Sequence, residues 1–307
     1  MTRWRMSAIV GAAFGLVACG QRAPEPVAVA TAAWAPPSDS AIPEGPLGIS
    51  IRRGRALLID THDSLPSYAT SSLNCTSCHL DGGRRANAAP LTGVHGRFPA
   101  YLSRAGAVVS LEDRVNYCFT RSLSGNRLPS DSREMQDIIA YLAFLSHGAP
   151  SGAPAPAPAI AGIPVLQPDP TAGKTVYTTV CASCHGADGA GIGGAMPRAP
   201  ALWGPRSYSI GASMARVERA ASFIRHNMPF GAPGTLTDQQ AWDVAAYIDA
   251  QPRPDMPGKD ADWPSGGAPD DVPYATAGRT ASMSPPLLPR ATPERAMVPP
   301  PPSVRPR

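Results

Sequence analysis

The feature that most constrains this chain is a pair of CxxCH motifs whose first cysteines lie 106 positions apart. In such a motif the two thiols form thioether bonds to haem vinyl groups, and the histidine binds the iron. One motif alone could be half of a zinc site, but each of these two opens a segment of similar length and similar ending. The sequence therefore predicts two covalently bound haem c groups. The residues concerned are Cys75, Cys78 and His79 in the first motif, and Cys181, Cys184 and His185 in the second.

The N-terminus fits a protein whose haem is attached outside the bacterial cytoplasm. Arg3 and Arg5 precede an apolar run over residues 8–18, which has the length of a signal peptide and not of a membrane span. The run ends at Cys19 in the sequence LVACG, which resembles a lipobox. We expect a lipid anchor on Cys19 and a location on the periplasmic side of a membrane. The alternative is an ordinary signal peptide, an incidental cysteine and a soluble periplasmic protein.

Proline-rich stretches divide the chain, which contains 37 prolines among 307 residues. The stretch at 149–168 is rich in Pro and Ala and is typical of a semi-rigid linker. The C-terminal stretch has few apolar clusters with which to bury a core. The predicted parts are a signal peptide (1–19), a disordered tether (20–45), a first haem domain (46–148), the linker (149–168), a second haem domain (169–252) and a disordered Pro-rich tail (253–307).

Apolar residues recur at helical spacing in both compact segments, and strand-like alternation is rare. We expect helices near 51–61 and 172–180, each leading toward a CxxCH motif. A closing helix is expected around Met135 and Leu142 in the first segment, and another after the N-cap Thr237 in the second. The predicted fold is mainly α, with two small cytochrome c-type haem domains. In such short segments the haem supplies apolar surface that the chain lacks.

The charge of the chain is mild, with a formal net charge of +4 and a pI near 8.8. Lysine and arginine residues are dispersed, which argues against a nucleic-acid partner. A weak positive bias suits a small anionic substrate.

The distal ligand of the second haem is predicted from the position of its methionines. Met228 lies 43 residues after His185, is followed by proline and precedes the closing helix. Small cytochromes c place their ligand methionine there, and we therefore favour it. Met196 lies too soon after the motif, and packing on a helix explains Met214.

The first segment has no methionine at the equivalent place, and Cys118 stands there instead, 39 residues after His79. Ser110 and Asp113 predict a helix start that places Cys118 on an apolar face. Arg114 precedes it by one turn and favours the thiolate form. Two other interpretations stay open at this point. Cys118 could be a buried apolar residue, or the ligand could be one of two histidines, His95 and His147.

Four short runs resemble one known family, the thiosulfate dehydrogenase family of dihaem cytochromes c. They are RVNYCFTRS at 114–122, LWGP at 202–205, NMP at 227–229 and DVAAYI at 243–248. The resemblance covers about residues 46–255, and the tether and the long tail lie outside it.

Members of this family couple two thiosulfate ions to tetrathionate, and some run mainly in reverse. The resemblance implies that His79 and Cys118 bind the iron of the catalytic haem. It implies that His185 and Met228 bind the iron of a second haem, which passes electrons to an external acceptor such as a small soluble cytochrome c.

The resemblance also implies roles for Arg104, Arg114 and Ser122 beside the catalytic haem. Thiosulfate is a dianion, and the two arginines would offset the repulsion between two such ions. The thiolate of Cys118 would form a bond to a sulfane sulfur, giving a cysteine S-thiosulfonate.

Two rival functions remain open from the sequence. One is a membrane-tethered dihaem electron carrier in which Cys118 is structural. The other is the haem subunit of a sulfur-oxidising complex, which acts on substrate borne by a carrier protein.

Overall fold

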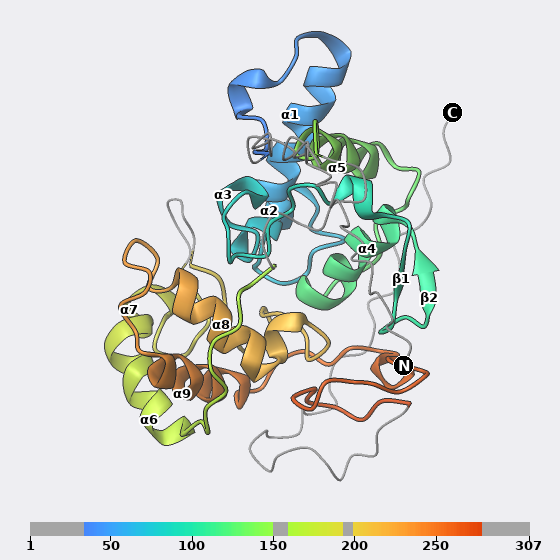
Figure 1. Ribbon diagram of the computed structural model, residues 1–307. Coiled ribbons are helices and arrows are strands. Elements are labelled where there is room, and N and C mark those ends of the chain that lie inside the picture. The colour runs from blue at the N-terminus through green and yellow to red at the C-terminus, as the bar shows by residue number, and fades with distance from the viewer. Residues whose placement is uncertain (1–33, 150–158, 193–198, 278–307) are drawn as a thin grey trace, which may run out of the picture. The chain divides into compact units, whose positions relative to one another are not determined.

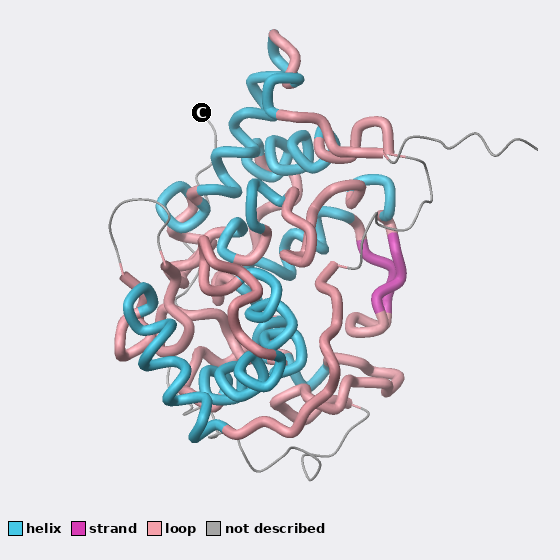
Figure 2. The backbone as a smooth tube through the Cα atoms, turned by 60° about the vertical axis from the view of Figure 1, so that its left-hand side comes forward, coloured by secondary structure: helices cyan, strands magenta, loops and turns pink. Residues whose placement is uncertain are grey.

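The computed structural model describes residues 34–149, 159–192 and 199–277. These residues are mainly helical, and their one sheet is a short antiparallel hairpin (Figures 1 and 2). The prediction of a mainly α fold is therefore confirmed.

The first haem domain contains five helices and both strands. Its closing helix begins where Ser132 accepts a hydrogen bond from the Met135 amide. Ser110 likewise accepts one from the Asp113 amide, as the sequence predicted. The elements are α1 (Gly45–Ile59), α2 (Thr61–Ser64), α3 (Leu80–Gly83), β1 (Ala100–Leu102), β2 (Ala107–Val109), α4 (Leu111–Tyr117), a π-helical turn (Cys118–Ser122) and α5 (Arg133–Phe144).

The second haem domain repeats this plan with helices, joined in its described residues by loops and one isolated β-bridge between Ile192 and Ala199. Thr237 caps its closing helix in a capping box with Gln240, as predicted. Pro170 opens the leading helix, where the amide hydrogen that proline lacks is not needed. The elements are α6 (Pro170–Val176), a π-helical turn (Tyr177–Cys181), α7 (Ala182–His185), α8 (Val217–Asn227) and α9 (Asp238–Asp249).

The leading and closing helices of each domain cross at a glycine. α1 packs against α5, and a Cβ on Gly54 would lie 1.9 Å from the carbonyl oxygen of Asp137. α6 packs against α9 in the same way, and a Cβ on Gly173 would lie 2.0 Å from the carbonyl oxygen of Asp243. The two crossings match in residue type and geometry, which supports the interpretation of the domains as a diverged repeat.

The segment that precedes α8 joins the two domains. Ser209 donates to the carbonyl of Arg121 through both its amide and its hydroxyl, at 3.0 and 2.7 Å. Tyr208 and Ala212 are buried in the apolar core of the first domain. The domains therefore share an interface.

Two segments predicted to be disordered are in part ordered. Before α1, Trp34 donates to the carbonyl of His147, and Asp39 pairs with Arg84 at 2.8 Å, so the tether prediction is wrong for residues 34–45. After α9, the tail prediction is wrong for 253–277, which bury aromatic side chains. A few large side chains are enough to order a short segment when they pack on a domain that is already folded. The buried apolar residues of this segment are Met256, Trp263, Val272 and Tyr274.

Several predictions lie outside the described residues. These are the signal peptide and Cys19, residues 20–33 of the tether, residues 150–158 of the linker, Met196, and residues 278–307 of the tail. Within the described ranges, none of the helices combines the length and the apolar character needed to span a bilayer.

Candidate active site

The first domain contains a cavity of about 350 Å³ beside its CxxCH motif. His79 and Cys118 both line this cavity, and His79 is close enough to Cys118 to lower the pKa of its thiol. The Nδ1 atom of His79 lies 2.5 Å from the carbonyl oxygen of Ala89, which orients the ring. The structure thus brings together the two residues predicted to bind iron here.

Arg114 and Cys118 interact across one helical turn. Arg114 Nη1 lies 3.6 Å from Cys118 Sγ, and both side chains line the cavity. Burial raises the pKa of the Cys118 thiol, but Arg114 and then His79 lower it by more, so that the net pKa is about 7 against an ordinary 9.0. The thiols of the haem motif behave differently, since burial raises the pKa of Cys75 and of Cys78 to about 12. Cys118 is therefore the thiol suited to act as a thiolate.

Three arginines line the first cavity, two of them predicted and one not. Arg104 and Arg114 lie on the wall as expected, and Ser122 lies there too. Arg121 also lines the cavity and was missed. Arg97 lies near Arg114 and was missed as well; burial and then Arg114 lower the pKa of Arg97. Neither Arg121 nor Arg97 stands out in the sequence, because an isolated arginine in a loop or helix is usually a solvated surface charge.

Arg114 differs from the other two arginines of the cavity in its partners. Arg104 and Arg121 both pair with Asp262, at 2.9 and 2.7 Å. Across residues 34–149, 159–192 and 199–277, the structure shows no carboxylate paired with Arg114. Its guanidinium and the thiol of Cys118 are therefore the groups best placed to meet an anion.

A cavity of about 370 Å³ with a mainly apolar lining lies beside the second CxxCH motif, and residues of both domains line it. Cys181, Cys184, His185 and Met228 line it. The Nδ1 atom of His185 lies 2.9 Å from the carbonyl oxygen of Pro200, and burial lowers the pKa of this histidine. Burial outweighs the opposing effect of this hydrogen bond on the pKa and favours a neutral imidazole, and the hydrogen bond at Nδ1 leaves the other ring nitrogen for a metal.

The residues of both cavities fit a haem c group. In each, the CxxCH histidine is oriented by a backbone carbonyl, and a sulfur-bearing side chain, from Cys118 or Met228, shares the cavity with it. All four motif cysteines are free of disulfide bonds. Three residues, Cys78, Met214 and Phe223, line both cavities, so the two sites are neighbours.

The alternative ligands do not reach the first cavity. His95 and His147 are exposed, and neither lines it. Met135 is fully buried in the core of the first domain, as its helical spacing predicted.

Comparison with known proteins agrees with this geometry. The cytochrome c family matches residues 170–251, and the SoxA/TsdA cytochrome c domain family matches residues 67–151. The thiosulfate dehydrogenase of Allochromatium vinosum is 45% identical over 252 residues, which cover 79% of this chain and 90% of that protein. This chain belongs to the thiosulfate dehydrogenase family. Two cytochrome c domains of this family imply covalently bound haem c.

Other members of the thiosulfate dehydrogenase family are similar over most of the chain. The thiosulfate dehydrogenases of Psychrobacter arcticus and Stutzerimonas stutzeri are each 40% identical, covering 77% and 72% of this chain and 73% of each relative. A solved thiosulfate dehydrogenase (TsdBA) from Marichromatium purpuratum is 39% identical, with a TM-score of 0.67. It matches over 75% of this chain, which spans about half (51%) of that longer chain.

Proposed function

We propose that this protein oxidises thiosulfate, coupling two ions into one tetrathionate and releasing two electrons. The observation that carries the proposal is the pairing of the Cys118 thiol with Arg114, 3.6 Å apart on the wall of the first cavity. The similarity to thiosulfate dehydrogenases over most of the chain supports the same substrate. The reverse reaction, reduction of tetrathionate, uses the same groups.

The residues of the first cavity match the charge and chemistry of the reaction. Two dianions must approach each other, and Arg114 offsets their repulsion with a charge-assisted hydrogen bond. The Cys118 thiolate and one thiosulfate lose two electrons as Sγ bonds to the sulfane sulfur. A second thiosulfate then attacks that sulfur, which releases tetrathionate and restores the thiolate. Ser122, one turn beyond Cys118, is a hydrogen-bond donor on the same wall.

We assign the iron ligands from the cavity linings. His79 and Cys118 hold the first haem, and His185 and Met228 hold the second, so that the chain carries two. Bound haem groups supply one-electron carriers for a two-electron reaction. The cavities share three lining residues, which favours electron passage from the first site to the second and then to an external acceptor such as a small soluble cytochrome c.

The test is an assay of the purified protein with free thiosulfate and with tetrathionate, using wild type and Cys118→Ala. Wild type should turn over at least one of the two substrates without a partner protein. Cys118→Ala should retain both haem groups, because the CxxCH motifs are unchanged, and should lose turnover. The near-infrared charge-transfer band of cysteinate-ligated ferric haem should also be lost in the Cys118→Ala variant.

Three outcomes would count against the proposal. Near wild-type turnover by Cys118→Ala would exclude the thiolate chemistry. Turnover that requires substrate on a carrier protein would favour a subunit of a sulfur-oxidising complex. Spectra typical of His/Met ligation at both sites, without turnover of either ion, would favour a plain electron carrier.

We also propose that the protein works on the periplasmic side of a membrane, held there by a lipid on Cys19. Haem c attachment and the LVACG sequence support this. Wild-type protein should be released from membranes by detergent and not by salt, and Cys19→Ser should not carry the lipid. Recovery of wild type in the soluble periplasmic fraction would contradict the anchor.

A further inference from the structure

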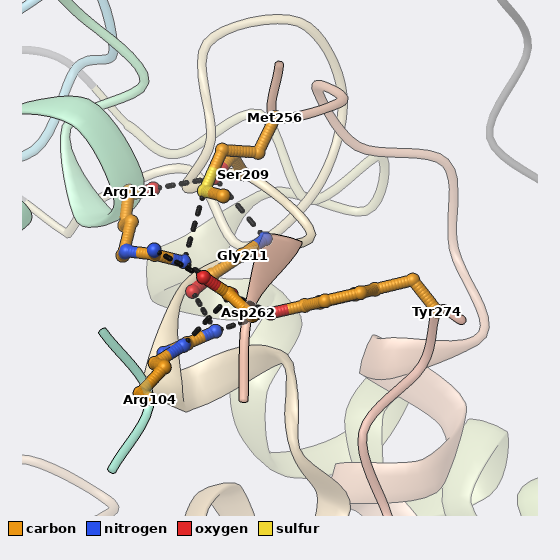
Figure 3. A network of polar contacts seen from close by, with 7 residues as sticks. All are labelled: Arg104, Arg121, Ser209, Gly211, Met256, Asp262 and Tyr274. Carbon is orange, nitrogen blue, oxygen red and sulfur yellow. Dashed lines mark hydrogen bonds and ion pairs between the residues drawn. The ribbon is translucent and has the colours of Figure 1, made fainter. Parts of the chain in front are cut away.

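One buried carboxylate pairs with two of the three arginines on the wall of the first cavity. Asp262 is 4% exposed and accepts hydrogen bonds from Arg121 through both of its oxygens, each at 2.7 Å. It also accepts from Arg104 Nε at 2.9 Å and from the Tyr274 hydroxyl at 2.7 Å. Figure 3 shows this carboxylate between the two guanidinium groups. Asp262 is therefore saturated with donors and cannot move without breaking several charged contacts.

The segment that carries Asp262 is anchored to the hairpin that carries Arg104. The Trp263 amide donates to the Arg104 carbonyl at 2.9 Å, and the Arg104 guanidinium stacks 4.6 Å above the Trp263 ring. Trp263, Val272 and Tyr274 form a small apolar cluster of their own. The segment 253–277 follows the second domain in sequence, yet it supplies a charge to the catalytic cavity of the first.

The contacts leave each arginine with a defined orientation. Arg104 Nη2 donates to the Gly211 carbonyl at 2.8 Å and also to the Tyr274 hydroxyl. Arg121 Nη1 contacts the sulfur of Met256 at 3.1 Å, in addition to its bidentate pair with Asp262. The positive charges of Arg104 and Arg121 thus share one negative charge, whereas Arg114, which lines the same cavity, pairs with no carboxylate among the described residues.

We propose that Asp262 is a positioning residue for the anion site of the first cavity. It fixes the orientation of Arg104 and Arg121, and it cancels one of the positive charges that would otherwise attract a dianion. This inference deepens the proposed function and rests on it, since thiosulfate and tetrathionate are the anions concerned.

The physical consequence is a compromise between affinity and orientation. A cavity with three unpaired arginines would attract any dianion strongly and in several poses. A cavity in which two arginines are held by Asp262 binds the dianion less tightly, but in a pose set by fixed donors. Because only a correctly oriented sulfane sulfur can react, the fixed donors favour turnover over binding.

The test compares Asp262→Asn, Asp262→Glu and Val272→Ala in the full-length protein with its haem groups. Asp262→Asn keeps the shape and removes the charge. We expect its kcat to fall at least tenfold, and its affinity for sulfate, a non-reacting dianion, to become three- to tenfold tighter by isothermal titration calorimetry at low salt. Val272 is 1% exposed beside Trp263, and its replacement loosens the same segment without a change of charge. It should leave kcat and sulfate affinity within twofold of wild type.

Asp262→Glu separates charge from geometry. It restores the charge at a displaced position, so sulfate affinity should stay within twofold of wild type while kcat remains at least fivefold reduced. If Asp262→Asn fails to retain haem, the kcat and the sulfate affinity of Asp262→Glu alone decide whether the inference holds. The inference is overturned if the Asn variant has a kcat within twofold of wild type, if its sulfate affinity does not tighten, or if Val272→Ala reproduces its effects.

The sulfate titration keeps this inference distinct from the proposed function. If wild type turns over neither thiosulfate nor tetrathionate, the proposed function fails. The sulfate affinities of the Asn and Glu variants then still decide whether Asp262 controls the charge of the cavity. Unchanged sulfate affinity in the Asn variant would overturn the inference in that case as well.

Discussion

At the scale of single residues, the pair formed by Arg114 and Cys118 carries the chemistry that we propose for the first cavity. A guanidinium 3.6 Å from a partly buried sulfur stabilises the thiolate, against the effect of burial. The same guanidinium has no carboxylate partner among the described residues, so it can also meet an incoming anion. In the proposed mechanism, Arg114 therefore serves both the Cys118 nucleophile and the substrate.

Arg114→Ala should lower kcat/KM for thiosulfate by about two to three decades, or about 2–4 kcal/mol of transition-state stabilisation. The loss has two sources, a weaker anion contact and a less stable thiolate. Arg114→Lys should recover only part of it, because an ammonium cannot form the planar fork of a guanidinium. Steady-state kinetics in both directions measure the effect.

Arg127→Ala is the matched control for this prediction. Arg127 pairs with Asp113 near the start of the same helix, and its side chain is 53% exposed. Its removal should leave kcat/KM within twofold of wild type, because a surface ion pair contributes little. Kinetics of Arg114→Ala within threefold of wild type would reduce Arg114 to a structural charge.

At the scale of secondary-structure elements, each domain depends on a close crossing of its first and last helices. The crossing in the first domain brings the backbone of α1 at Gly54 against the Asp137 carbonyl of α5. Asp137 is also held by Ser50 Oγ at 2.6 Å and by Arg53 Nη2 at 3.0 Å. Only glycine allows this approach, because any side chain would overlap the Asp137 carbonyl, whose residue is also tied to α1 through its carboxylate.

Gly54→Ala should destabilise the first domain by about 1–3 kcal/mol, because the helices must separate to admit a methyl group. Thermal unfolding followed by circular dichroism measures the loss. Gly96→Ala is the control, since a Cβ there meets nothing within 4 Å. Equal unfolding temperatures for the two variants would show that the crossing tolerates a side chain.

At the scale of the whole molecule, the segment 253–277 ties the end of the second domain to the first cavity. Its contacts include Asp262 with Arg104 and Arg121, and the Pro254 carbonyl with the Ile210 amide at 2.8 Å. The two contacts of Asp262 join parts of the chain more than 100 residues apart. The stability of the segment and the charge of the cavity are therefore linked.

The link predicts a pH dependence of stability. Burial raises the pKa of Asp262, but its hydrogen bonds from Arg121 and Tyr274 lower it by more, so the net pKa lies below the ordinary 3.8. The unfolded chain then binds a proton before the folded one does, and stability falls as the pH drops through this range. Wild type should exceed Asp262→Asn by about 3–5 kcal/mol near neutrality, and the difference should shrink below about pH 4.

Urea unfolding of both proteins between pH 3 and pH 7 measures this difference. The comparison removes effects common to both proteins, such as protonation of other groups in acid. A difference that stays constant over the whole range would mean that the Asp262 carboxylate does not titrate with folding.

The sequence alone determined the features that are local in the chain. The CxxCH spacing predicted covalent haem, and helical periodicity predicted the mainly α fold. The side-chain caps at Ser110 and Thr237 were predictable because a cap and its target amide lie within three residues. The pairing of Arg114 with Cys118 was predictable for a similar reason, since helical geometry places residues four apart on one face.

Only the tertiary structure decided the features that depend on contacts between distant segments. Asp262 and Trp263 lie in a Pro-rich stretch whose composition predicted disorder, and the pairs with Arg104 and Arg121 span 158 and 141 positions. Neither hydrophobic periodicity nor motif spacing in the sequence predicts such a contact. A short segment with few apolar residues becomes ordered when another part of the chain provides the surface and the opposite charge that it lacks. Those partner groups are in place only after the domains have folded.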